Sequence, residues 1–206
     1  RDTVRQFAEK TVAPHVREMD RAQKMNPDLV KAAFEMGLMG IEIPTDLGGS
    51  GANFTTAIIA VEELAAVDPS VAVCVDVQNT LVNNAILRWG NEEQKKRYCP
   101  RLASNLPASY CLSEAGSGSD AFALATRAVE DGDVCRLTGE KMWITNGAEA
   151  GFYLILATVN PSLGYKGITA FLVERGFQGF EVGKKEDKLG IRAPSTVTLH
   201  LDGCAV

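Results

Sequence analysis

The sequence changes its pattern near the middle, and this change limits the fold more than any other feature. Residues 1–107 contain six glycines and residues 108–206 contain thirteen. In the first part apolar residues recur at the helical period, whereas the second part has short β-branched or aromatic runs separated by turn dipeptides. The chain is therefore predicted to be α+β, with an N-terminal all-α domain over 1–107 and a β-barrel or β-sandwich domain over 108–206.

Local signals place the boundaries of the expected elements. Asn26-Pro27, Asn53 and Asp68-Pro69 are typical helix starts, and Asn91 with Gln94 has the form of a capping box. Pro14 should interrupt the first helix. The expected helices span residues 1–21, 27–36, 54–66, 69–89 and 92–102. The expected strands span residues 135–138, 152–159, 168–173 and 196–201.

Composition excludes several classes of function. Lysine and arginine total 21 against 26 acidic residues, a net charge of −5, which argues against a nucleic-acid-binding protein. No apolar run approaches the roughly 18 residues that a membrane helix needs. Five cysteines without C-x-x-C spacing and two histidines predict free thiols and no metal site. Because the chain starts at Arg1 without a leader and stops soon after an expected strand, we expect a fragment or a processed form.

The strongest local signal is the segment 110–120, with the sequence YCLSEAGSGSD. An expected short strand runs into a loop in which Gly116 and Gly118 allow close approach of backbone amides to a ligand. Ser117 and Ser119 add hydroxyl groups. The segment has neither a Walker lysine nor Rossmann spacing. Its chemistry suits a phosphate or another polar cofactor group, but composition alone favours a solvated turn before a strand.

A second signal is the segment 141–147, with the sequence KMWITNG. Trp143 on a β surface is able to form a wall beside a flat aromatic ligand, and Thr145 offers a hydroxyl to the polar edge of such a ligand. The alternative is a half-buried tryptophan in an ordinary hairpin closed by Asn146-Gly147.

Taken together, the two segments resemble the acyl-CoA dehydrogenase family of flavoproteins. The first is similar to its signature of Ser/Thr-Glu followed by Gly-Ser-Asp, and the second to its Trp-Ile-Thr flavin segment. Further family-like motifs occur in order at 37–40, 44–51, 62–65, 90–94 and 188–192. Within the family, the short/branched-chain enzymes are most similar, on the segments 70–73, 78–81 and 164–171.

The resemblance implies an FAD-dependent oxidoreductase that dehydrogenates an acyl-CoA thioester between its α and β carbons, in fatty-acid oxidation or branched-chain amino-acid breakdown. In the family a carboxylate removes the α-proton, the β-hydrogen leaves as hydride, and electrons pass to an electron-transfer flavoprotein. Family members have a third, C-terminal helical bundle that carries the catalytic glutamate. That bundle is expected to lie beyond Val206, so no catalytic residue is predicted here. A homotetramer in the mitochondrial matrix is the corresponding expectation.

The resemblance also assigns roles to individual residues. Ser113 is expected near the pyrimidine edge of the flavin, Trp143 beside its rings and Thr145 near N5. Ser119 is expected at the pyrophosphate and the acyl-CoA, and Tyr165 at the substrate. The full set of expected cofactor-binding residues is Tyr110, Cys111, Leu112, Ser113, Glu114, Ala115, Gly116, Ser117, Gly118, Ser119, Trp143, Ile144 and Thr145.

Other polar residues are interpreted as structural, and two alternative functions remain. Glu114 is interpreted as a loop-shaping carboxylate and not as the base. His15 and His200 are interpreted as packing or solvated residues, and the mixed-charge run 184–188 as a solvated turn. Two other functions remain: an acyl-CoA oxidase-like flavoprotein, or a non-catalytic truncated module that binds or pairs with other subunits.

Overall fold

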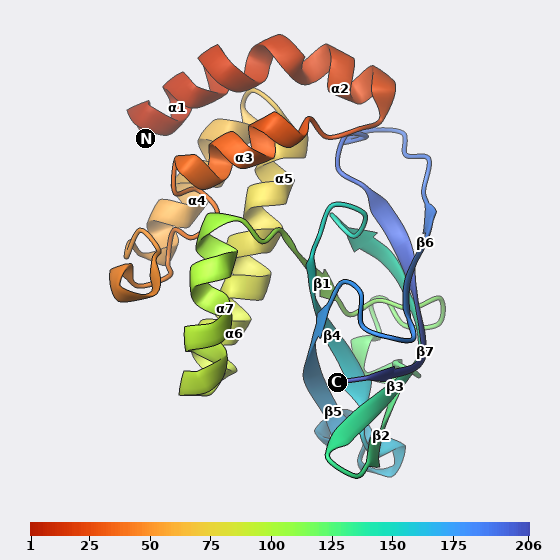
Figure 1. Cartoon of the computed structure of the whole chain (residues 1–206). Helices are drawn as coiled ribbons and strands as arrows, with labels where there is room; N and C mark the ends of the chain where they lie inside the picture. The colour runs from red at the N-terminus through yellow and green to blue at the C-terminus, as the bar shows by residue number, and fades with distance from the viewer. The chain divides into compact units, whose positions relative to one another are not determined.

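A computed structural model describes residues 1–206, which form two compact units (Figure 1). The first unit comprises Arg1–Pro107 together with Asp187–Ser195. The second comprises Ala108–Glu186 and Thr196–Val206. Sequence reasoning placed the segment 187–195 with the strands, but this excursion packs with the helices, and Ala193 is buried in the helical core.

The regular secondary structure of the first unit is all helical. Its elements in chain order are α1 (Asp2–Phe7), η1 (Ala8–Val12), η2 (Ala13–His15), α2 (Val16–Ala22), α3 (Pro27–Glu35), η3 (Thr45–Leu47), α4 (Phe54–Ala65), α5 (Pro69–Asp76), η4 (Val77–Asn83), α6 (Asn84–Trp89) and α7 (Glu92–Ser104). The first helix narrows to a 3₁₀ turn around Pro14, because proline cannot donate the regular helical hydrogen bond.

Side chains cap the helices where the sequence indicated. The side chains of Asn26, Asn53 and Asp68 each accept a hydrogen bond from a backbone N–H in the first turn of the helix that follows. Asn91 and Gln94 form the expected reciprocal capping box. These bonds satisfy N–H groups that have no partner inside the helix, so the caps determine where each helix begins.

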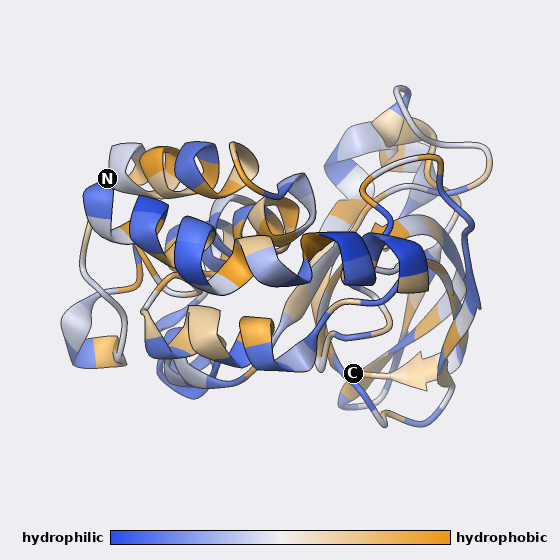
Figure 2. Cartoon of the chain, turned by 90° about the horizontal axis from the view of Figure 1, so that it is seen from above, coloured by the Kyte–Doolittle hydropathy of each residue, from blue (hydrophilic) through white to orange (hydrophobic).

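The helical core is mainly apolar, but it also contains buried polar side chains: Glu63, Asp68 and Ser70, and a group in η4, a π-helical stretch. The side chains of Gln78, Asn79 and Asn83 are buried there and donate to backbone carbonyls of neighbouring segments. Seen from above, the long N-terminal helix consists mostly of polar residues (Figure 2). None of the helices combines the length and apolarity that crossing a bilayer requires.

The second unit is a curled seven-stranded sheet that forms half of a barrel. Its strands are β1 (Ala108–Cys111), β2 (Arg127–Asp131), β3 (Val134–Thr145), β4 (Phe152–Thr158), β5 (Ile168–Glu174), β6 (Phe180–Lys185) and β7 (Thr196–Ala205), with the short helices η5 (Ala121–Ala123) and η6 (Pro161–Gly167) between them. The order is β1-β4-β2-β3-β7-β6, with β5 paired to β4. The main core of this unit includes the side chains of Leu137, Tyr153 and Leu199.

The structure extends and corrects the predicted strands. The strand expected at 135–138 continues to Thr145, and the strands β2 and β6 were not predicted. Asn146-Gly147 does not close a hairpin, because β3 pairs with β2 and β7 and not with β4. The five cysteines are present as thiols, and four of them are buried.

Candidate functional site

A β-bulge in β3 shapes the Trp143 segment. Between the pairs Lys141–Leu199 and Ile144–Val197, β3 advances three residues while β7 advances two. The extra residue breaks the ladder locally, and Trp143 adopts φ 58°, which is rare for a bulky side chain. Trp143 is 55% exposed, and it does not lie in a hairpin closed by Asn146-Gly147, because β3 pairs with β2 and β7. Strained backbone with an exposed aromatic side chain is typical of a binding site.

The loop after β1 is folded on itself. Glu114 and Ser117 exchange backbone hydrogen bonds of 2.8 and 3.1 Å, which place Ala115 and Gly116 at the tip of a tight turn. The Ser117 side chain is buried, and its hydroxyl donates to the carbonyl of Asp120 at 2.9 Å. Ser117 therefore shapes the loop and does not present its hydroxyl to a ligand.

Side-chain and backbone contacts join this loop to the bulge. The Met142 N–H, freed from the ladder with β7, donates to the carbonyl of Ser113 at 2.8 Å. The Lys141 ammonium donates to the carbonyl of Leu112 at 3.0 Å and to the carboxylate of Glu114 at 2.6 Å. The two segments that the sequence singled out are thus one interlocked structure.

Glu114 and Lys141 form a buried ion pair beneath the loop, with the Lys141 side chain wholly inaccessible. The Glu114 carboxylate also accepts from the backbone of Ala125 and from the N–H and hydroxyl of Thr126, at 2.6, 3.1 and 2.5 Å. Burial alone would raise the pKa of Glu114, but the bonds from Lys141, Thr126 and Ala125 together lower it. Burial lowers the pKa of Lys141, and Glu114 opposes that shift. Glu114 is therefore a fully engaged carboxylate, unsuited to accept a proton from a substrate.

Other polar groups at the site have no partner inside the chain. The hydroxyls of Ser113, Ser119 and Thr145 and the indole N–H of Trp143 make no hydrogen bond in the chain, and none of these four residues is fully buried. Groups of this kind are available to a bound molecule. The site therefore divides into residues that hold its shape and residues whose polar atoms are free for a ligand.

Two loop glycines border open space. A side-chain carbon built at Gly116 or Gly118 meets no atom within 4 Å, and neither residue has a left-handed backbone. The fold itself would therefore accept alanine at both positions. The space beside these backbone amides is compatible with a close-lying polar cofactor group, which is the use that the sequence suggested for the glycines.

The remaining expected cofactor-binding residues differ in how far their side chains are exposed to solvent. The Cys111 and Ile144 side chains are buried in the sheet core, and burial raises the pKa of the Cys111 thiol, so these two residues face a ligand only through their backbone. Tyr110 and Leu112 are half-buried and Ala115 is exposed. Burial raises the pKa of the Tyr110 hydroxyl.

Tyr165, the expected substrate residue, lies on η6 and is 60% exposed. Its ring lies 5.5 Å from the ring of Phe122 on η5, which is 67% exposed. Two large aromatic side chains are thus paired with each other at the surface. One of them, Phe122, follows Ser119 by three residues in the sequence. The sequence analysis did not single out Phe122.

The other polar residues that the sequence raised lie elsewhere. His200 lies on β7 with its Nδ1 3.1 Å from the Glu140 carboxylate. The run 184–188 is not simply solvated, since Lys188 donates to the carbonyl of Pro194 at 2.6 Å and Asp187 accepts from Gln23 at 2.9 Å.

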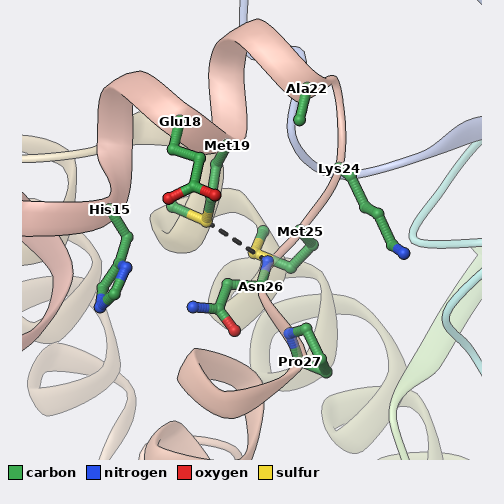
Figure 3. A pocket seen from close by; sticks show the side chains of 8 residues that line it. All are labelled: His15, Glu18, Met19, Ala22, Lys24, Met25, Asn26 and Pro27. Carbon is green, nitrogen blue, oxygen red and sulfur yellow. Dashed lines mark hydrogen bonds between the residues drawn. The ribbon is translucent and has the colours of Figure 1, made fainter.

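His15 borders a cavity of about 290 Å³ at the turn between α2 and α3 (Figure 3). The cavity is lined by His15, Glu18, Met19, Ala22, Lys24, Met25, Asn26 and Pro27. The Met19 sulfur accepts from the backbone N–H of Asn26 at 3.4 Å, and Lys24 points away from the other side chains. The cavity belongs to the helical unit and includes neither of the two segments that the sequence singled out.

Several residues of the site were missed by sequence reasoning. Lys141 had no expected role beyond being the first residue of the segment 141–147, and Thr126 had none at all. Arg175 was also missed: its guanidinium donates to the carbonyls of Gly147, Ala148 and Ala150 and so holds the turn that follows Thr145. A charged residue inside a β run was the one available signal for Lys141, because an unpaired buried charge is costly.

Comparison with known proteins gives the same family for both units. Residues 1–105 match the family described as "Acyl-CoA dehydrogenase, N-terminal domain", and residues 109–204 match "Acyl-CoA dehydrogenase, middle domain". A "Probable short/branched chain specific acyl-CoA dehydrogenase" of Dictyostelium discoideum is 55% identical over the whole chain and 50% of its own length. The "Short/branched chain specific acyl-CoA dehydrogenase, mitochondrial" of Bos taurus is 47% identical over the whole chain and 48% of its own length.

A solved structure shows the same fold. The glutaryl-CoA dehydrogenase of Mycobacterium smegmatis, in complex with FADH2, has a TM-score of 0.92 and 33% identity over all of this chain and 52% of its own. The chain spans about half the length of the curated relatives it matches. The helical and β units follow the order of the two matched domains, with the segment 187–195 of the second match packed in the helical unit, and the chain belongs to the acyl-CoA dehydrogenase family, of which it comprises the N-terminal and middle domains.

Proposed function

We propose that this chain supplies the flavin-binding middle domain and the N-terminal domain of an FAD-dependent dehydrogenase of short or branched acyl-CoA thioesters. One observation carries the proposal: two segments far apart in the sequence are locked together, yet their outward polar groups at Ser113, Trp143 and Thr145 have no partner inside the chain. The FADH2 complex of the relative from M. smegmatis and the names of the curated relatives support FAD and acyl-CoA.

The residues of the site fit the parts of FAD that they would hold. Thr145 would donate its hydroxyl near flavin N5, Ser113 would bond the pyrimidine edge, and the exposed Trp143 indole would pack beside the rings. The amides around Gly116 and Gly118, with the Ser119 hydroxyl, would bond the pyrophosphate. FAD, when bound, supplies the two-electron chemistry, and the protein supplies its position and surroundings.

The acyl-CoA would contact Ser119 and Tyr165. The names of both reported curated relatives include short/branched-chain acyl-CoA, which favours substrates such as 2-methylbutanoyl-CoA. By the family resemblance, the carboxylate that accepts the α-proton would come from outside residues 1–206. Glu114 would not replace it, because it already accepts bonds from Lys141, Ala125 and Thr126. We extend the proposal to an electron-transfer flavoprotein as partner, a homotetramer, and a mitochondrial location like that named for the bovine relative.

The test is to purify the longest polypeptide encoded in frame with residues 1–206 and record its visible spectrum. We expect a yellow protein whose flavin bleaches when 2-methylbutanoyl-CoA is added without oxygen. A protein without flavin that FAD does not reconstitute would overturn the proposal. Rapid oxygen consumption by the reduced protein would favour an oxidase on the same scaffold.

A further inference from the structure

We propose that Lys141, with Glu114, is a positioning residue for the cofactor: the buried pair holds the loop 112–119 and the Trp143 bulge in the one arrangement that accepts FAD. The inference rests on the proposed function and deepens it. It adds a residue that makes no contact with the ligand and acts through the backbone groups it holds.

The geometry shows what the pair holds. The ammonium of Lys141 reaches the carbonyl of Leu112 and the carboxylate of Glu114, immediately before and after Ser113. The Glu114 carboxylate in turn accepts from the backbone amides of Ala125 and Thr126, which follow η5 and lead into β2. One ion pair thus ties the start of the loop, and the residues that lead from it into β2, to β3.

The packing around the pair is adapted to these bonds. Gly139 on β3 has φ 151°, and a side-chain carbon there would lie 2.7 Å from the Thr126 hydroxyl and 2.8 Å from the Thr126 Cα. Glycine therefore allows Thr126 to approach the strand closely while its hydroxyl and amide bond Glu114. The contact needs a residue without a side chain at that point of the strand.

Stability alone does not explain two charges at this position. Replacing a buried ion pair by uncharged residues of similar size is often neutral or stabilising, because burial of charge is expensive. What an uncharged pair lacks is the directional bond from an ammonium to the Leu112 carbonyl. The pair therefore contributes position more than it contributes folding free energy.

The test compares four variants of the full-length flavoprotein: K141M, E114Q, the double variant E114Q/K141M, and D131N as a control. D131N breaks an exposed ion pair with Arg136 at the β2–β3 turn of the same sheet, outside the candidate site. FAD affinity is measured by fluorescence titration of the apoprotein, the flavin environment by visible spectrum and midpoint potential, and stability by thermal unfolding of the apoprotein.

We expect K141M and E114Q to weaken FAD binding at least about tenfold and to shift the flavin spectrum, since bonds that hold the loop are lost. The double variant should recover apoprotein stability, because no charge is left unpaired, without recovering FAD affinity. If K141M does not fold, the double variant provides the measurement.

A double variant that recovers both quantities, or one that binds FAD as D131N does, would show that the pair is merely structural and would overturn the inference. If wild type and D131N bind no FAD, the proposed function itself fails and the inference falls with it.

Discussion

Substitution of Gly118 by alanine should change folding stability and FAD affinity in opposite directions. The built side-chain carbon meets no protein atom within 4 Å, and the backbone is not left-handed, so the folded chain is not strained. Alanine also reduces the freedom of the unfolded chain. Together these effects should stabilise the apoprotein by about 0.4–1 kcal/mol.

The same methyl group would occupy space that we assign to the FAD pyrophosphate. If it displaces one hydrogen bond between a backbone amide and a charged oxygen, the loss is about 1.5–3 kcal/mol, or roughly 10–150-fold in the dissociation constant. Thermal unfolding of the apoprotein and titration with FAD measure the two effects separately.

Gly190 offers a matched control. It also has open space at its side-chain position and no left-handed backbone, but it lies in the segment 187–195 of the helical unit. G190A should raise stability similarly and leave FAD affinity unchanged. Equal FAD affinity in G118A, G190A and wild type would refute the assignment of the loop to the pyrophosphate.

Four other expectations follow from the site. T145A should shift the flavin spectrum or midpoint potential, since one hydrogen bond near N5, worth about 1 kcal/mol, is lost. Y165A should lower kcat/KM for 2-methylbutanoyl-CoA, and a full-length enzyme that prefers palmitoyl-length chains would contradict the substrate assignment. Residues 1–206 expressed alone with FAD should release no deuterium from a 2-deuterated short acyl-CoA, because loss of a positioned base removes about 10²–10⁴-fold of rate; release at the full-length rate would place a base within this chain. Because the pKa of Glu114 is lowered in the folded chain, its stabilising contribution is complete above the ordinary carboxyl pKa of about 4.3 and is lost as the pH falls through the lowered value. As the solution is acidified, the wild-type protein should therefore lose a larger part of its pH 7 stability than E114Q does, which pH-dependent thermal unfolding measures.

The parts of the fold that sequence predicted well are those determined by neighbouring residues. Caps at Asn26, Asn53 and Asp68 bond amides two or three positions away, so a local pattern suffices to locate them. The strand β4 was predicted because it is apolar on both faces, as its burial shows. The strands β2 and β6 were missed because both are mostly polar or partly exposed and carry no clear alternation.

The sequence proposed which residues form the candidate site, but it did not predict the contacts that hold them together. Residues 110–119 and 143–145 were selected by their resemblance to a family, while the bulge at Trp143 depends on the register between β3 and β7. The partner of Glu114 lies 27 residues along the chain at Lys141, a separation at which no local rule applies. The same holds for Arg175, which bonds a turn 25 to 28 residues earlier.

The division between engaged and free polar groups also bears on how the cofactor would bind. Ser117, Glu114 and Lys141 satisfy one another or the backbone inside the chain, so the loop has its shape before a ligand arrives. A ligand that meets a preformed loop does not have to compensate for ordering it, which favours tight binding. The Ser113, Thr145 and Trp143 groups then exchange only water for ligand. Breaking the bonds of the buried Glu114–Lys141 pair should thus reduce FAD affinity, as removal of a direct contact at Ser113, Thr145 or Trp143 would.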